Sequence, residues 1–223
     1  MTNKVKLLLI FCSVFVAAVA IASNMGFKLN YNLVTNSAGN NINWVSIPYF
    51  DNYTAAEDVC TDINTVDCAA GTASSILYFD TANNSFVGHT CGSSKNNFNI
   101  VAGSAYQIFV TTSCTFKLVG SHDDSYDSTN GVSFYSNATG NNINWISVPY
   151  HTQSALAEAL CTEINTNCAN IVSSITYFDT ANNSFVGHTC GSSKNNFNIV
   201  PGSGYQAFVT SASAGACWHP SHY

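Results

Sequence analysis

The sequence predicts a mainly antiparallel β protein made of two tandem homologous modules, each with one short helix and each stabilised by disulfide bonds. Three observations predict it. The chain of 223 residues repeats itself once, apolar and polar residues alternate along short segments, and the cysteines outside the N-terminal apolar run fall four to each copy. Alternation of this kind, with turn residues between the segments, is typical of β-sandwich-like folds.

The repeat is visible as long matching segments. Three pairs match closely: 39–49 with 140–150, 78–101 with 177–200, and 103–111 with 202–210. The middle pair is identical over 24 residues. A period of about 100 residues is the size of a small domain and too long for a solenoid unit. We therefore expect one module at residues 23–119 and a second at residues 120–223.

Within a copy, the expected elements follow the order β-β-α-β-β-β-β. In the first copy, the expected strands are 27–33, 43–49, 76–79, 86–87, 98–100 and 106–110. Pro48 should end the second strand or hold it at a sheet edge. The helix is predicted where Thr54 and Glu57 form a capping-box pattern, with Val59 and Ile63 following at helical spacing. Residues 154–164 give the same pattern in the second copy.

The N-terminus has the features of a secretory signal peptide. Lys4 and Lys6 precede an apolar run from residue 7 to residue 22, and Ala20 and Ala22 fit the small-residue cleavage pattern. Sixteen helical residues span about 24 Å, less than the ~30 Å of a bilayer core. We expect cleavage after Ala22, secretion to the extracellular space or cell surface, and no stable membrane insertion afterwards. An uncleaved membrane anchor is the alternative.

The cysteine pattern agrees with export. Eight cysteines follow the apolar run: Cys60, Cys68, Cys91, Cys114, Cys161, Cys168, Cys190 and Cys217. An even number in an exported chain predicts disulfide bonds, and the absence of C-x-x-C disfavours redox motifs and zinc knuckles. Four cysteines allow three pairings per copy, and the sequence does not choose among them.

Among these pairings, we favour a link from the helix to the segment after the hairpin, because it would tie the helix to the sheet. It would join Cys60 to Cys91 and Cys161 to Cys190. The remaining cysteines would then pair as Cys68 with Cys114 and Cys168 with Cys217.

Charge excludes two classes of partner. Only 8% of residues are charged, there is no arginine, and the formal net charge is −6. Nucleic-acid binding needs a basic face, and so does attraction to an anionic membrane surface. We therefore expect neither partner, and the surface should be covered by Asn, Ser, Thr and Gly.

Five residues recur at matching positions in the two copies: Trp44, Cys60, Cys91, Gly103 and Tyr106 in the first, and Trp145, Cys161, Cys190, Gly202 and Tyr205 in the second. The motifs that contain these residues resemble uncharacterised cysteine-bearing β-rich modules of secreted and surface proteins of bacteria. The resemblance covers nearly the whole mature chain. It implies an extracellular repeat module and supplies no activity.

Candidate ligand-binding residues are few. Trp44 and Trp145 are flanked by apolar residues, so we expect them in the module cores, and the more exposed aromatic candidates are Tyr49, Phe50 and Tyr150. His219 and His222 are weak metal candidates, whereas His89 and His188 fit structural roles. The segment after Asp123 resembles a calcium loop but lacks its Gly and its bidentate Glu. No cofactor is expected.

The function expected from these features is non-enzymatic, since neither a nucleophile elbow nor a zinc-protease motif is present. We expect a secreted or cell-surface protein with a structural or adhesive role. Low charge gives little self-repulsion, which favours self-association into an oligomer, fibre or surface layer. Two alternatives stay open: a carbohydrate-binding protein, and a secreted hydrolase or metal-dependent enzyme.

Overall fold

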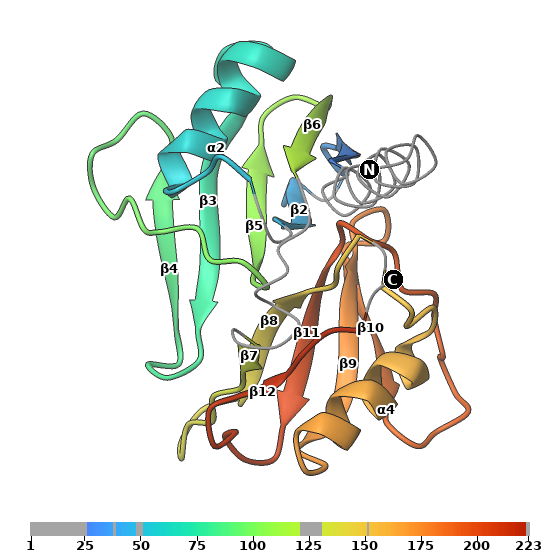
Figure 1. Ribbon diagram of the computed structural model, residues 1–223. Helices are drawn as coiled ribbons and strands as arrows, with labels where there is room; N and C mark the ends of the chain where they lie inside the picture. Colours follow the sequence, from blue (N-terminus) through green and yellow to red (C-terminus); the bar gives the residue numbers. More distant parts are fainter. Residues whose placement is uncertain (1–25, 38, 48–50, 121–130, 151, 222–223) are drawn as a thin grey trace, which may run out of the picture.

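Two similar β-rich units follow each other along the chain in the computed structural model (Figure 1). The structure describes residues 26–37, 39–47, 51–120, 131–150 and 152–221. The predicted signal peptide, residues 1–22, lies outside the described residues. The predicted fold class is confirmed, because the described strands pair antiparallel throughout and each unit has one helical segment.

The first unit contains a four-stranded sheet, a two-stranded sheet and one helical segment. Its elements are β1 (Phe27–Leu33), β2 (Ile42–Ser46), α2 (Ala56–Asp62), η1 (Ile63–Asp67), β3 (Ala73–Asp80), β4 (Ser85–Thr90), β5 (Ala105–Val110) and β6 (Cys114–Gly120). The larger sheet has the order β2-β5-β3-β4, and β1 pairs with β6. Helix α2 packs against β3, so its apolar side closes the core of the unit.

The second unit repeats this arrangement. Its elements are β7 (Val132–Ser133), β8 (Ile143–Ser147), α4 (Ala157–Asn167), β9 (Val172–Asp179), β10 (Ser184–Thr189), β11 (Gly204–Val209) and β12 (Ala216–Trp218). The larger sheet has the order β8-β11-β9-β10, and β7 pairs with β12. The copies differ most at their first strand, because β1 has seven residues and β7 only two.

The helices also differ, and a single inserted residue explains the difference. Cys60 and Cys68 are eight positions apart, whereas Cys161 and Cys168 are seven apart. In the second unit α4 is one continuous α-helix, but in the first unit α2 passes into the π-helical turn η1. A π-turn accommodates one extra residue without unwinding the helix, so both copies can place their second cysteine at the helix end.

Most predicted strands are confirmed, with two corrections. The alternation along β1 is as expected, since Phe27 and Leu33 are buried and the asparagines between them are exposed. Residues 98–100, expected to form a strand, make only an isolated bridge at Asn99. Strand β6 was not predicted, because the last strand expected in the first module was 106–110; its alternation is clear, with Phe116 and Leu118 buried.

The predicted capping box is wrong. The side chain at the start of α2 that binds the backbone is Asp58, which accepts hydrogen bonds from the Thr54 and Ala55 amides at 2.8 and 2.9 Å. These bonds hold the pKa of Asp58 below its usual value. Glu57 points elsewhere, because its carboxylate is used by His89. Because Glu57 and Asp58 are adjacent acids in the first helical turn, the sequence alone did not show which of them caps the helix and which binds the histidine.

Four disulfides tie the helices and outer strands to the sheets. The structure joins Cys60 to Cys91, Cys68 to Cys114, Cys161 to Cys190 and Cys168 to Cys217. These are the pairs that the sequence analysis favoured. Each unit has its own apolar core, and the disulfide cysteines belong to or border it. Such a pattern indicates folding in an oxidising environment.

A third, smaller apolar cluster joins the two units. Trp44 and Trp145 are buried, as expected, but they pack against each other with ring centroids 4.2 Å apart rather than inside the module cores. Each tryptophan also contacts aromatic rings on the other unit's hairpin: Trp44 contacts Phe178 and Phe185, and Trp145 contacts Phe79 and Phe86. The expectation failed because strand alternation shows which residues share a face, not what covers that face.

Hydrogen bonds across the interface follow the same two-fold pattern. The Ser46 amide donates to the Gly202 carbonyl, and the Ser147 amide donates to the Gly103 carbonyl, both at 2.9 Å. The contact is closest at Gly204, where an added Cβ would lie 2.8 Å from the Cβ of Ala105. Ala105 is the residue of the first copy that corresponds to Gly204, so the interface has room for one methyl group at this pair of positions.

We expect Gly204→Ala to lower the free energy of unfolding by about 1–3 kcal/mol, because it overpacks a closed interface. The exchange Ala105→Gly/Gly204→Ala restores one methyl group and should recover most of the loss, as urea unfolding of Gly204→Ala, Ala105→Gly and the double variant will show. Additive losses in the double variant would contradict a direct contact between the two positions.

Candidate functional site

Two arrangements of polar side chains in the structure could carry a function. The first occurs once in each unit and involves a histidine, a glutamate and a disulfide. In the first unit, His89 on β4 is fully buried and its Nε2 lies 2.6 Å from the Glu57 carboxylate on α2. Its Nδ1 lies 3.0 Å from the Lys95 carbonyl. His188, Glu158 and Lys194 repeat this geometry in the second unit.

The hydrogen bonds fix the orientation of each histidine ring. A carbonyl oxygen can only accept, so His89 Nδ1 must carry a hydrogen. The Nε2 atom faces the Glu57 carboxylate at 2.6 Å. The same carboxylate accepts a 2.9 Å hydrogen bond from the Gly92 amide, directly after Cys91. Helix, edge strand and the following loop are thus joined at one carboxylate.

The ligand atoms of Glu57, Cys60 and His89 all lie within 4.8 Å of one another, as do those of Glu158, Cys161 and His188. The set has the chemistry of a zinc site. However, both cysteines are disulfide-bonded, and a thiolate is what binds metal. In the oxidised protein the cluster therefore holds the helix, the edge strand and the following loop together, and we call this arrangement the structural clip. Sequence analysis assigned the histidines to structure but did not identify their partners.

We expect Glu57→Ala to lower the free energy of unfolding by about 1–3 kcal/mol, because it leaves the buried His89 Nε2 and the Gly92 amide without an acceptor. Glu57→Gln, which keeps an acceptor oxygen, should lose less. Urea unfolding of both variants, with the Glu158 pair as an internal replicate, measures the effect. Equal stabilities of the wild type and Glu57→Ala would contradict the clip.

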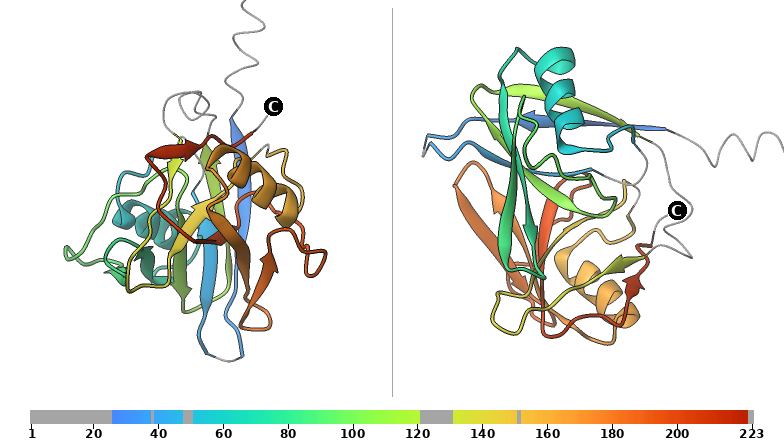
Figure 2. Two further views of the ribbon diagram at one scale, coloured as in Figure 1. Left: turned by 90° about the horizontal axis from the view of Figure 1, so that it is seen from below. Right: turned by 90° about the vertical axis from the view of Figure 1, so that its left-hand side faces the viewer.

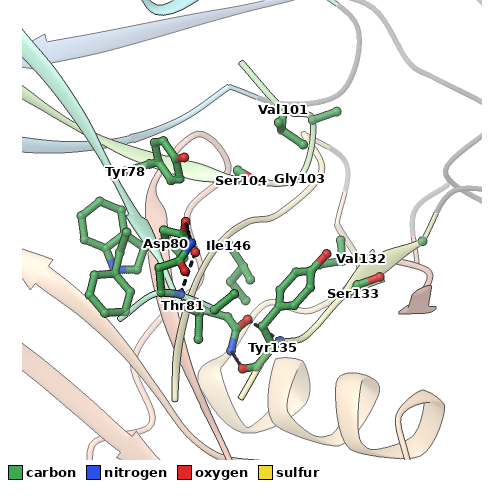
Figure 3. Close-up of a pocket in the computed structure, with 17 residues that line it drawn as sticks. Tyr78, Asp80, Thr81, Val101, Gly103, Ser104, Val132, Ser133, Tyr135 and Ile146 are labelled. Carbon is green, nitrogen blue, oxygen red and sulfur yellow. Dashed lines mark hydrogen bonds between the residues drawn. The ribbon is translucent and has the colours of Figure 1, made fainter. Parts of the chain in front are cut away.

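The second arrangement is a groove of about 560 Å³ between the two units. Figure 3 shows the ring of Tyr78 on one side, the ring of Tyr135 on the other, and Asp80 between them. Tyr135 is 55% exposed. The lining comes from the end of β3 and the hairpin turn, the turn before β5, β7 and its flanks, and β8: residues 78–83, 101–104, 131–133, 135 and 144–146.

Polar groups at the groove are oriented by the hairpin turn. Asp80 accepts hydrogen bonds from the backbone and side-chain nitrogens of Asn83 at 3.1 and 2.7 Å. A carboxylate has about four acceptor positions, so two remain for a ligand. Partial burial and the neighbouring Asp80 charge raise the pKa of Tyr78, which keeps its hydroxyl a hydrogen-bond donor. Among the residues that the structure describes, the lining includes no lysine and no histidine.

The two-fold pattern of the interface gives this groove a counterpart. It lies where Trp44 and Val45 meet residues 200–203, and its volume is about 220 Å³. Tyr31 occupies it: the hydroxyl donates to the Ser46 carbonyl, and an added Cβ on Gly202 would lie 3.0 Å from that hydroxyl. Figure 2 shows β1 and β2 beside the hairpin of β9 and β10, where Asn40 donates to Asn183.

The residue that corresponds to Tyr31 in the second copy is Val132. One pair of hydrogen bonds fixes this correspondence. The Val34 amide donates to Asn43 Oδ1, and the Tyr135 amide donates to Asn144 Oδ1, where Asn43 and Asn144 hold the same position in the repeated motif. Valine lacks the ring and the hydroxyl, so within the described residues the Tyr31 side chain narrows one groove, the filled groove, and no corresponding ring narrows the other, the open groove.

The predicted ligand residues fall mostly elsewhere. Tyr49, Phe50 and His222 lie outside the described residues, as does the calcium-like segment from Asp123 to residue 130. Tyr150 is 42% exposed and stacks on Phe27, with centroids 5.2 Å apart. His219 is half-buried beside Gly131 and belongs to neither of the two clusters of potential metal ligands found among the described residues. Of the two described candidates, neither Tyr150 nor His219 lines the open groove.

Comparison of the chain with protein-family models, curated proteins and solved structures finds no match. The resemblance to cysteine-bearing modules therefore stays a prediction. In the part of the chain that the structure describes, no helix has the length and apolar character required to cross a membrane.

Proposed function

We propose that this protein is a non-enzymatic extracellular structural or adhesive protein that associates with copies of itself. The observation that carries the proposal is a pair of identical edge strands. β4 and β10 are the last strands of their sheets, and both read Ser-Phe-Val-Gly-His-Thr. In the described structure each pairs with one neighbour only, β4 with β3 and β10 with β9.

Edge strands are ready-made sites for pairing with another chain unless charges, proline or bulges protect them. β4 and β10 contain no charged residue and no proline. Phe86 and Phe185, at the second position of each strand, are 61% and 52% exposed. Two equivalent edges on one molecule allow each chain to contact two others, which extends into a chain of molecules when the contact does not close.

Surface chemistry supports the same proposal. With 8% charged residues, two copies meet with little electrostatic repulsion. Apolar side chains that are at least a third exposed lie in both units: Val66, Phe86, Val101, Val119, Tyr135, Tyr150, Leu156, Phe185 and Val200. The disulfides and the predicted signal peptide together support a location outside the cell.

Light scattering and electron microscopy of the purified, disulfide-bonded protein test the proposal. We expect species larger than the monomer, and we expect their size to grow with protein concentration. The variant Ser85→Lys/Thr90→Lys/Ser184→Lys/Thr189→Lys places charges at exposed positions on both edges and should shift the protein to monomers.

A matched control places four lysines on exposed helical positions instead, as Thr61→Lys/Thr65→Lys/Thr162→Lys/Thr166→Lys. It should associate like the wild type if the edges make the contact. A wild type that stays monomeric at high concentration, or equal dissociation of both variants, would contradict edge pairing.

An enzymatic role has less support from the geometry. Asp80 lies opposite Ser85 at the turn of the β3–β4 hairpin, and His89 lies opposite Ile76. Four residues of strand separate them by ~13 Å, and His89 is fully buried against Glu57. The acid and base that a hydrolase would need are therefore not brought together at these positions.

A further inference from the structure

The counterpart of the open groove indicates what kind of ligand the open groove could bind, because the Tyr31 side chain lies in that counterpart. In the filled groove, the occupant is a flat six-membered ring with a hydroxyl group, the side chain of Tyr31, which hydrogen bonds to a strand carbonyl. The two grooves have corresponding walls, formed by Trp44 and residues 200–203 in one and by Trp145 and residues 101–104 in the other. A ring of similar size should fit the open one.

We propose that the open groove binds a neutral sugar chain, with a pyranose ring in the place that Tyr31 takes in the counterpart. The volume of about 560 Å³ lies in the range of small-ligand sites. It exceeds the counterpart's 220 Å³, and Val132 stands where the counterpart has Tyr31. This proposal is independent of association between chains.

Two aromatic side chains supply the apolar surfaces that a sugar ring needs. Tyr135 is 55% exposed and Tyr78 is half-buried, and they face the cavity from different units (Figure 3). The C–H face of a pyranose packs on such rings as other apolar groups do, while their hydroxyls stay available for hydrogen bonds.

Polar groups in the same groove select a neutral polyol. Asp80 has acceptor positions beyond those used by Asn83, and sugar hydroxyls are donors. Ser104 and Ser133 add hydroxyl groups to the lining. With Asp80 present and no lysine or histidine among the described lining residues, an anionic sugar would meet a like charge. A purely apolar side chain from a partner would leave these groups unpaired.

Binding is tested with three neutral trisaccharides, cellotriose, maltotriose and triacetylchitotriose, and one anionic one, trigalacturonate. Isothermal titration, together with the intrinsic fluorescence of Trp145 in the wall, measures affinity in the full-length, disulfide-bonded protein. We expect saturable binding of at least one neutral sugar, one per chain, and none of trigalacturonate.

Three variants locate the site. Val132→Tyr installs the residue of the filled groove and should abolish binding while leaving the thermal midpoint unchanged or raised. Tyr135→Ala should weaken binding by about tenfold or more. Tyr150→Ala, which alters an exposed aromatic side chain outside the groove, is the matched control and should bind like the wild type.

The converse variant Tyr31→Val should open the counterpart and raise the stoichiometry towards two if it folds. The proposal is overturned if the wild type binds none of the neutral sugars at millimolar concentration, or if Val132→Tyr binds as tightly as the wild type. Saturable binding of N-acetyltyrosinamide with no binding of sugars would also overturn it, in favour of a protein partner that inserts an aromatic side chain.

Discussion

Replacing Cys60 and Cys91 together by alanine should lower the free energy of unfolding by about 3–4 kcal/mol. The disulfide closes a loop of 31 residues, and the chain-entropy model assigns about that value to a loop of this length. Cys60 lies on the buried face of α2, so alanine also leaves a small cavity. Urea unfolding at neutral pH under non-reducing conditions measures the change.

The second unit provides a matched test. The Cys161–Cys190 disulfide closes 29 residues in the same position, so its double alanine variant should lose a similar amount. Reduction of all four disulfides should unfold the chain, because their summed effect is comparable with the 5–15 kcal/mol total stability of a typical domain. A fully reduced protein that keeps its fold would contradict this account.

Trp44→Ala should lower the free energy of unfolding by about 3–5 kcal/mol and uncouple the two units. The ring contacts Trp145 at 4.2 Å, Phe185 at 5.7 Å and Phe178 at 6.4 Å between centroids, all in the other unit. Removing it creates a large cavity in the interface. We expect urea unfolding to change from one transition to two, and NMR relaxation to show separate tumbling of the units.

Two other variants separate this effect from general destabilisation. Trp44→Phe keeps a ring and removes an indole nitrogen that is buried without a hydrogen-bond partner in the described structure, so it should cost much less. Trp218→Ala removes a tryptophan from the core of the second unit and should destabilise that unit without uncoupling the pair. Single-transition unfolding of Trp44→Ala at wild-type stability would show that the interface contributes little.

The sequence predicted those features that depend on local pattern. Alternation located β1, the repeat predicted two units, and the even cysteine count predicted disulfides, because each of these is visible in neighbouring or repeated residues. The interface was not predictable in the same way. Trp44 was assigned to a module core because alternation cannot distinguish a face that covers a helix from a face that covers the other unit.

The candidate sites were even less visible. The open groove forms where the hairpin of one copy meets the first strand of the other, so its residues come from segments that no spacing rule connects. A closer alignment of the copies would have shown one signal, the valine at position 132 opposite the tyrosine at position 31. Glu57 and Asp58 illustrate a different limit, since adjacent acids at a helix start can each serve as the cap.

The unequal grooves also say something about why the two copies are covalently joined. A homodimer of identical single-module subunits related by an exact two-fold axis would have two identical grooves, both filled or both open. Because the copies are fused, Tyr31 and Val132 are encoded separately. Tyr31 can then stabilise the contact between the two units in one groove, while the residue at position 132 is free to differ in the other groove. One chain that carries both copies thus allows an asymmetry that a symmetric oligomer of identical single-module chains cannot have.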